Sequence, residues 1–263
     1  MDLPFSKYQG AGNDFVMIDQ VIAQYLSMEN RELIARICDR HFGIGGDGLI
    51  WIEENGLGKY KMIYFNADGG LGSMCGNGGR CFAQFAKDLG YVDDEITFEA
   101  YDGFHTARVE DSSISLSMNP VDQIRAISDF EFELNTGSPH YIDFQSDIST
   151  LDIFTLGRKI RYSDLYKAKG INVNFVQETN GALSLATYER GVEAETLACG
   201  TGVTAAALAF GFKNGLMGTQ QIAVKAKGGD LIVRFDQHMP GKFQNIWLTG
   251  PAEKVFDGVY RYF

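Results

Sequence analysis

The chain has 263 residues, a length that two domains of ordinary size fill comfortably. Hydrophobic residues make up 45% and charged residues 22%, which is typical of a folded globular protein and excludes a disordered one. The formal net charge is −11, so the chain lacks the excess of basic residues that is typical of a nucleic-acid-binding protein. The same charge argues against docking on an anionic membrane. We find no signal peptide pattern, no apolar stretch long enough to span a bilayer and no disulfide framework, so we expect a cytoplasmic protein with reduced thiols.

The predicted elements follow one another in a mixed order. Residues 30–40 place Leu33, Ile34 and Ile37 on one face of a helix. Residues 203–212 (VTAAALAFGF) are small or apolar on all sides, which predicts a helix buried all round, as if wrapped by a curved sheet. A third helix is expected at 149–159, and strand-like runs at 48–53, 61–70, 96–100, 105–109, 113–118, 184–193, 221–226 and 231–235.

Two segments of the chain match each other. Cys75–Ala83 reads CGNGGRCFA and Cys199–Ala207 reads CGTGVTAAA, and each runs into helix-forming sequence. A strand-like run precedes each segment, and a strand, a Gly-containing turn and a second strand follow each one. We therefore expect a duplicated α+β chain, with halves at residues 1–119 and 120–263 and the last strand a candidate to return to the first half.

A glycine-rich run at Gly43–Gly48 fits the G-x-G-x-x-G pattern of dinucleotide-binding folds. That pattern must follow a strand and open a helix, whereas this run follows a helix and opens a strand. We reject the dinucleotide interpretation and expect a tight loop near a substrate.

The paired Cys-Gly-x-Gly loops carry the strongest chemical signal. A thiol at a helix N-terminus is stabilised as thiolate by the helix dipole, and the unpaired N–H groups beside it form an anion site. An ordinary buried cysteine is the alternative interpretation, and we prefer it for Cys38 and Cys81 but not for Cys75 and Cys199, because their loops match. The cysteine spacings fit neither a structural zinc site nor a C-x-x-C redox pair, so we expect no metal.

Three polar residues of the second half have ambiguous roles on their own. His140 follows Ser138-Pro139, and a lone histidine is more often structural than catalytic. Glu189 and Arg190 form a pair of a kind that usually lies solvated at a strand end. Near a substrate of mixed charge, however, Arg190 would hold a carboxylate bidentately and Glu189 an ammonium group, which is the interpretation we favour beside Cys199.

The order of these motifs resembles diaminopimelate epimerase. The similar segments are KYQGAGNDFVMID, FNADGGLGSMCGNGGRC, TGSPHYID, INVNFV and YERGVEAETLACGTG, and they extend from about residue 6 to about residue 250. The resemblance implies an α+β fold of two pseudo-symmetric halves, each a mixed, curled β-sheet around a central helix. It also implies a homodimeric isomerase that converts LL- to meso-diaminopimelate without cofactor, in the lysine and peptidoglycan pathway.

The resemblance also assigns residues. Cys75 and Cys199 become the catalytic acid–base pair, and His140 and Glu189 become groups that tune the thiols. The implied cradle for the reacting carboxylate is Gly76, Asn77, Gly200 and Thr201, and the implied binders of the distal end are Asn13, Asn66, Asn172, Glu189 and Arg190. Ser138 and Gly48 depart from the family pattern, which often has Asn and sometimes Gln at those positions.

Two alternatives remain open. A related two-thiol racemase acting on proline or hydroxyproline would share both cysteines, but Arg190, Asn66 and Asn172 argue against it because such a substrate has no distal charged end. A binding module for an amino acid, with incidental cysteines, is the alternative from another class.

Overall fold

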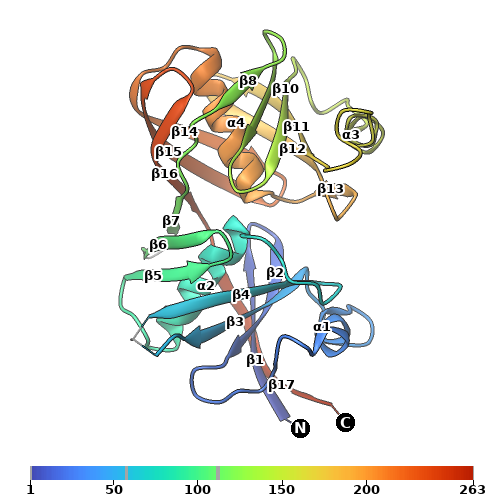
Figure 1. The fold of residues 1–263 in the computed structure, drawn as a ribbon, viewed down its shortest axis with the longest axis vertical. Coiled ribbons are helices and arrows are strands. Elements are labelled where there is room, and N and C mark those ends of the chain that lie inside the picture. The colour runs from blue at the N-terminus through green and yellow to red at the C-terminus, as the bar shows by residue number, and fades with distance from the viewer. Residues whose placement is uncertain (1, 57–58, 111–112, 263) are drawn as a thin grey trace. The chain divides into compact units, whose positions relative to one another are not determined.

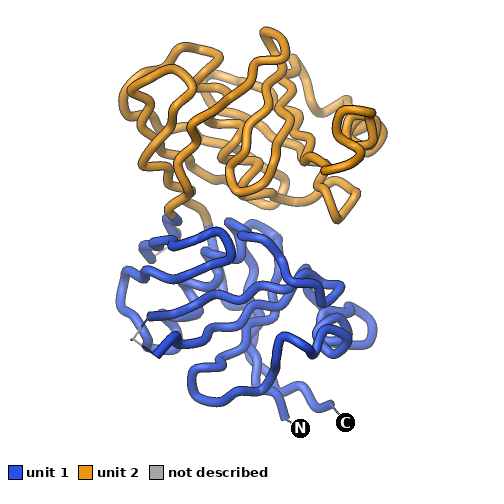
Figure 2. Tube along the Cα trace, in the orientation of Figure 1, with its two compact units in different colours: residues 1–116, 251–263 blue, residues 117–250 orange. Residues whose placement is uncertain are grey.

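A computed structural model describes residues 2–56, 59–110 and 113–262. Its contacts divide the chain into two compact units, Met1–Leu116 with Pro251–Phe263, and Ser117–Gly250 (Figure 2). The division expected from the sequence placed residues 117–119 in the first half and named the last strand as a candidate to return to it.

The first unit is built on a mixed sheet. Its elements are β1 (Asp2–Gly10), β2 (Asn13–Asp19), α1 (Arg31–Cys38), β3 (Gly48–Glu54), β4 (Tyr60–Asn66), α2 (Gly76–Asp88), β5 (Glu95–Ala100), β6 (Gly103–Val109), β7 (Ile114–Met118) and β17 (Glu253–Arg261). From β1 to β7 consecutive strands are neighbours, and their pairings run antiparallel, parallel, antiparallel, parallel, antiparallel and antiparallel. The last strand of the chain, β17, pairs with β1 and completes this sheet.

The second unit repeats this plan. Its elements are β8 (Ile124–Ala126), β9 (Glu131–Asn135), β10 (Pro139–Phe144), α3 (Ile153–Arg161), β11 (Asn172–Thr179), β12 (Ala182–Glu189), β13 (Ala194–Thr196), α4 (Gly200–Lys213), β14 (Gly218–Ala226), β15 (Gly229–Met239) and β16 (Lys242–Gly250). The series β9, β10, β11, β12, β14, β15 and β16 has the same alternation of antiparallel and parallel pairings as β1 to β7. The helices also fall at the same places in the two series, so the predicted duplication is confirmed.

One helix lies at the centre of each unit (Figure 1). In the first unit α2 contacts β1, β2, β3, β4, β6 and β17, and in the second unit α4 contacts β9, β10, β11, β12, β14, β15 and β16. A helix that touches so many strands of one sheet must be wrapped by that sheet. Every residue of α4 from Gly200 to Gly211 is buried, as the all-apolar sequence predicts. The predicted fold of curled mixed sheets around central helices is therefore confirmed.

The outer face of each sheet carries a second helix. In the first unit Ile34 and Ile37 of α1 join one buried cluster with Leu49 and Trp51 of β3. Ile50, between them in β3, points the other way and lies against Gly78 of α2. In the second unit α3 packs in the same manner on β10, β11 and β12. Each sheet thus separates a short outer helix from a largely buried inner one.

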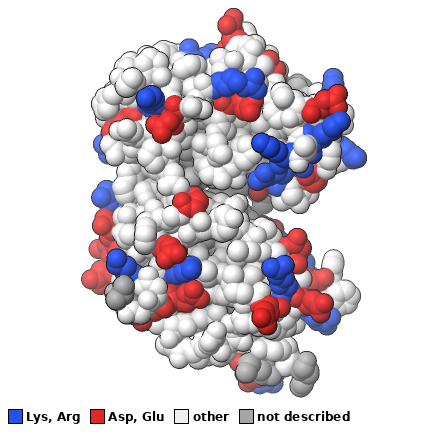
Figure 3. Space-filling model, viewed as in Figure 1, with Lys and Arg blue, Asp and Glu red and all other residues white. Residues whose placement is uncertain are grey.

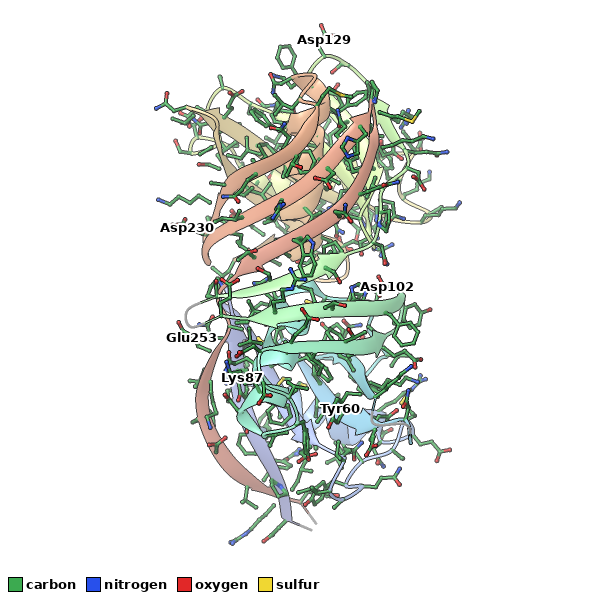
Figure 4. All side chains as sticks on the ribbon, turned by 90° about the vertical axis from the view of Figure 1, so that its left-hand side faces the viewer. Tyr60, Lys87, Asp102, Asp129, Asp230 and Glu253 are labelled. Atoms are coloured by element: carbon green, nitrogen blue, oxygen red, sulfur yellow. The ribbon has the colours of Figure 1, made fainter. Side chains whose placement is uncertain are left out.

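The hairpins after the two central helices match as expected. Ala100 pairs with Gly103 across the β5–β6 turn, and Ala226 pairs with Gly229 across the β14–β15 turn. Figure 4 labels Asp102 in the first turn and Asp230 beside the second. Acidic and basic side chains are interspersed over the face drawn in Figure 3, and within the described ranges no helix is long and apolar enough to cross a membrane.

Candidate active site

Cys75 occupies the N-cap of α2, directly before the first helical residue, Gly76. Its extended backbone, with φ −119° and ψ 118°, turns the side chain back over the first turn, where Sγ accepts the N–H of Gly78 at 3.4 Å. The first N–H groups of a helix have no partner within it and carry partial positive charge. The sulfur therefore stands where a capping acceptor normally stands, and negative charge on it would be stabilised.

Asn13, the first residue of β2, lies beside this thiol. Its Oδ1 is 3.6 Å from Cys75 Sγ and accepts the amide N–H of Asn77 at 3.3 Å. Its Nδ2 donates to Asp47 Oδ2 at 2.6 Å. The structure therefore brings together three of the predicted site residues, Asn13, Cys75 and Asn77, around one helix start.

Ion pairs fix the loop that holds Asp47. Arg40 bonds the carboxylates of Asp47 and Asp14, and Asp14 also pairs with the buried Lys7 at 2.7 Å. Burial would raise the pKa of Asp14, but hydrogen bonds from Arg40 and Lys7 outweigh it and lower that pKa to about 2. The loop from Gly43 follows α1 and opens β3, as expected, and through Asp47 it supports Asn13.

Arg80 lies completely buried beneath the first cysteine loop. It donates to Asn77 Oδ1 at 2.9 Å, to the carbonyl of Gly76 at 3.3 Å and to the carbonyl of Pro251 at 3.2 Å. Burial lowers its pKa to about 10, which leaves the guanidinium charged at neutral pH. A fixed cation thus lies directly under the residues predicted to cradle a carboxylate.

Cys199 occupies the corresponding N-cap of α4 and is 7% exposed. Its Sγ lies 3.5 Å from the hydroxyl oxygen of Thr201, in the first turn. Gly202 is required here, because a Cβ at that position would lie 2.5 Å from Asn174 Oδ1 and 3.4 Å from Cys199 Sγ. The second thiol therefore has a side-chain hydroxyl beside it, in contrast to the amide oxygen beside the first.

His140, in β10, connects to this hydroxyl. Its Nε2 lies 2.9 Å from Thr201 Oγ1, and its ring is fully buried. Burial, and then the charge of Arg190, lower the pKa of His140 to about 3, so the imidazole is neutral at physiological pH. His140 therefore reaches Cys199 through Thr201.

Arg190 and Asn172 lie together at the ends of β12 and β11. Asn172 is 4% exposed, and its Oδ1 accepts the backbone N–H of Arg190 at 2.9 Å. The half-buried Arg190 side chain donates to the carbonyl of Lys169 at 3.1 Å. Glu189 precedes it at the end of β12 and is also half-buried. In the first unit Asn66 ends β4 and is exposed.

The comparisons with known proteins agree with this geometry. A family model described as diaminopimelate epimerase matches residues 5–122 and 132–255. The chain belongs to the diaminopimelate epimerase family. The resemblance expected from the sequence motifs is confirmed, and with it the prediction of an isomerase.

Relatives in this family match over nearly their whole length. The chain is 48% identical to the diaminopimelate epimerase of Flavobacterium psychrophilum over 253 residues, covering 95% of this chain and 97% of that one. It is 41% identical to the diaminopimelate epimerase of Chlorobaculum tepidum, over 95% and 98% of the two chains. Solved structures with the same fold include a PhzF-family phenazine biosynthesis protein of Bacillus anthracis, at TM-score 0.74, 13% identity and full coverage of both chains. A hydroxyproline epimerase of Agrobacterium vitis follows at TM-score 0.71 and 14% identity, over 98% and 92% of the chains.

One departure from the diaminopimelate epimerase pattern has a steric explanation. A Cβ at Gly48 would lie 2.4 Å from the carbonyl oxygen of Phe65 and 2.5 Å from the ring of Tyr64. No side chain fits there without movement of the backbone, so the close packing of β3 against β4 requires glycine at this position. Ser138 is half-buried, and its carbonyl accepts the N–H of Thr136 at 3.2 Å.

Among the polar residues that sequence reasoning left unassigned are Arg80, Asn174 and Thr187, whose hydroxyl donates to Asn174 Oδ1 at 2.9 Å. Arg80 lies inside the CGNGGRC motif. A charged residue directly after two glycines, in a helix expected at the centre of its half, could have marked it as part of the site. Asn174 stands inside the quoted INVNFV motif, as a polar residue in an apolar strand. Thr187 carries no such signal, because threonine is common in strands.

Proposed function

We propose that this chain epimerises LL-diaminopimelate to meso-diaminopimelate by acid–base catalysis with Cys75 and Cys199, without a cofactor. The observation that carries the proposal is the pair of Cys-Gly-x-Gly loops, each with its cysteine at the N-cap position of the central helix of its unit. Membership of the diaminopimelate epimerase family, with a relative of that name 48% identical, supports the choice of substrate.

The chemistry requires a proton to leave one face of Cα and another to arrive on the opposite face. A thiolate on one side and a thiol on the other accomplish this in a single pass, and the two sulfurs exchange protonation states in each turnover. We assign the two roles to Cys75 and Cys199, with the direction of the reaction deciding which sulfur accepts the proton.

The carbanion is the difficult species, because the adjacent carboxylate already bears negative charge. We assign its stabilisation to the starts of α2 and α4, at Gly76, Asn77, Gly200 and Thr201, where helix N–H groups and dipoles favour an anion. One such donor contributes about 2.7–4 kcal/mol when measured by deletion, so several donors are needed. The buried Arg80 guanidinium would add a full positive charge behind the first loop.

The distal ammonium and carboxylate of the substrate need hydrogen-bonding partners and groups of opposite charge. We assign the hydrogen-bonding amides to Asn13, Asn66 and Asn172, and the charged groups to Glu189 and Arg190. The planar guanidinium of Arg190 suits a carboxylate, and Glu189 suits an ammonium group. His140 and Glu189 are proposed to tune the thiols. Within the described ranges, no three His, Cys, Asp or Glu side chains form a group that could hold a metal ion.

The biological setting is part of the same proposal. We infer a cytoplasmic homodimer that acts on a free amino acid in lysine and peptidoglycan precursor synthesis, with neither nucleic acid nor membrane as a partner. The net charge of −11 supports the absence of polyanionic partners.

The test is a stereochemical assay with purified protein. LL-Diaminopimelate, L-proline and trans-4-hydroxy-L-proline are incubated separately, before and after dialysis against a chelator, and the isomers are separated on a chiral column. We expect diaminopimelate to be the only one of the three substrates that is converted, and we expect its meso isomer to form at the same rate before and after dialysis. Turnover of a proline substrate would instead favour the racemase, activity restored only by added metal would contradict a cofactor-free reaction, and binding without turnover would favour an amino-acid binding module.

A further inference from the structure

Asn174, in β11 of the second unit, is a fully buried amide beside the imidazole of His140. Its Nδ2 lies 3.1 Å from His140 Nδ1, 3.0 Å from the carbonyl oxygen of Tyr141 and 3.4 Å from that of Asn172. Its Oδ1 lies 2.9 Å from the hydroxyl of Thr187, which donates to it. The amide therefore uses both of its ends in fixed hydrogen bonds.

These contacts determine which way the amide is turned. Backbone carbonyl oxygens only accept hydrogen bonds, so the atom of Asn174 that faces Tyr141 and Asn172 must be its NH2 group. The Thr187 hydroxyl then satisfies the opposite, accepting end. Because both ends are matched, the amide is locked with its NH2 group, and not its oxygen, facing His140.

The locked amide determines the tautomer of His140. An amide nitrogen donates and does not accept, so His140 Nδ1 must be the unprotonated, accepting nitrogen. Burial and the charge of Arg190, the charged group that acts on this ring, lower the pKa of His140 to about 3, so no second proton is bound near neutral pH. The one ring proton lies on Nε2, which donates to Thr201 Oγ1 at 2.9 Å.

The direction of that bond determines what Thr201 does. With a lone pair of its hydroxyl oxygen occupied by the His140 proton, the hydroxyl proton points to the next neighbour, Cys199 Sγ, at 3.5 Å. The carbonyl of Thr201 accepts a hydrogen bond from Thr136 at 2.8 Å, which holds this turn in place. The hydrogen bonds that begin at Asn174 and pass through His140 thus end with the Thr201 hydroxyl donating to the Cys199 sulfur.

We propose that Asn174 is a positioning residue that acts through His140 and Thr201 to aim a hydroxyl donor at Cys199 and so favour its thiolate form. At the first loop, by contrast, the Cys75 sulfur lies 3.6 Å from the accepting oxygen of Asn13. The significance for catalysis rests on the proposed function, but the arrangement itself is a property of the substrate-free protein.

The first experiment measures the tautomer directly in the wild-type chain. Nitrogen-15 labelling of histidine and NMR at neutral pH report which ring nitrogen of each of the four histidines carries the proton. We expect His140, assigned by loss of its signals in His140→Gln, to be protonated on Nε2 alone. Protonation on Nδ1, or on both nitrogens, overturns the proposal without requiring any Asn174 variant to fold.

The second experiment measures the consequence at sulfur. Iodoacetamide alkylation of each cysteine is followed by peptide mass spectrometry from about pH 5 to pH 10, a range that brackets ordinary thiol ionisation. Asn174→Leu and Thr201→Val should move the midpoint of the Cys199 profile to higher pH by about one unit, the scale of one charge-assisted hydrogen bond. Thr201→Ser keeps the hydroxyl and should retain the wild-type midpoint.

Cys75 in the same samples is the internal control, and its profile should stay unchanged in all three variants. A Cys199 midpoint that does not move in Asn174→Leu, or an equal shift at Cys75, overturns the proposal. Neither experiment uses turnover, so a chain that fails to epimerise diaminopimelate can still confirm the positioning role of Asn174.

Discussion

The guanidinium of Arg80 donates to Asn77 Oδ1 at 2.9 Å, and Asn77 in turn donates to the Asn13 oxygen that faces the Cys75 sulfur. A fully buried cation thus orders the first cysteine loop from behind. The second loop is ordered by a neutral series of hydrogen bonds through His140. The two loops therefore share the same position at a helix N-terminus, but different side chains hold them in place.

Replacing Arg80 with Met should destabilise the protein strongly. The change removes a buried charge and leaves the acceptors on Asn77, Gly76 and Pro251 without this donor. Each buried acceptor that loses its hydrogen bond costs about 1–3 kcal/mol of stability. Urea denaturation should show a loss of about 3 kcal/mol or more in the free energy of unfolding. Arg108→Met, at a side chain 56% exposed, is the matched control and should change it little. Equal stability of the two variants would show that Arg80 has no structural role.

Adding a methyl group at Gly202 should be more damaging than adding one at Gly78. The new Cβ at Gly202 would meet Asn174 Oδ1 at 2.5 Å, and that amide is held by Thr187 and by the Tyr141 carbonyl. At Gly78 the closest atom, 2.8 Å away, is the far end of the flexible Ile50 side chain.

We therefore expect Gly202→Ala to cost about 1–3 kcal/mol of stability, as over-packing of a core does, and Gly78→Ala to cost less. Thermal unfolding of the two variants beside wild type measures the difference. The reverse order of melting temperatures would contradict the contacts described for Asn174.

Acid should destabilise the protein through His140. Its pKa is about 3 in the folded chain and 6.5 in the unfolded one, so the unfolded state binds the additional proton. The contribution of His140 to stability is therefore constant above about pH 6.5 and falls progressively as the pH drops from 6.5 toward 3.

His140→Gln should flatten the pH dependence of the melting temperature in this window. His41→Gln, at an exposed position, serves as the control and should keep the wild-type slope. An unchanged slope in His140→Gln would mean that this histidine does not have to be buried in its neutral form.

Arg190→Lys should raise the Michaelis constant for diaminopimelate while leaving the folded structure intact. Lysine keeps the positive charge but loses the planar fork that holds a carboxylate with two hydrogen bonds. Steady-state kinetics measure the effect, and Arg158→Lys, at an exposed position on α3, is the control. If the Michaelis constant stays the same in Arg190→Lys, Arg190 does not recognise the distal end.

Local patterns in the sequence were sufficient to predict the main architecture. The two Cys-Gly-x-Gly loops, the all-apolar run at 203–212 and the hairpin turns are each encoded within a few neighbouring residues, and each is found as predicted. The short strand β13 (Ala194–Thr196) was not predicted, because three residues carry no measurable alternation. Contacts between distant residues were also beyond sequence patterns. The pairing of Asn174 with His140 depends on the register of β10 with β11, and that of Arg80 with Pro251 on the return of the chain after β16.

The most direct measurement of the central claim follows the Cα proton in heavy water. With one thiol on each face, meso-diaminopimelate formed from the LL isomer should carry deuterium from the first turnover, while the remaining substrate stays largely protonated. Cys75→Ser and Cys199→Ser should each lose most epimerisation, because serine is a much poorer base than a thiolate, and each should exchange the Cα proton of one isomer only, with opposite preferences. Exchange of the same isomer by both variants, or epimerisation by either at near the wild-type rate, would contradict the assignment of Cys75 and Cys199 as opposed acid–base partners.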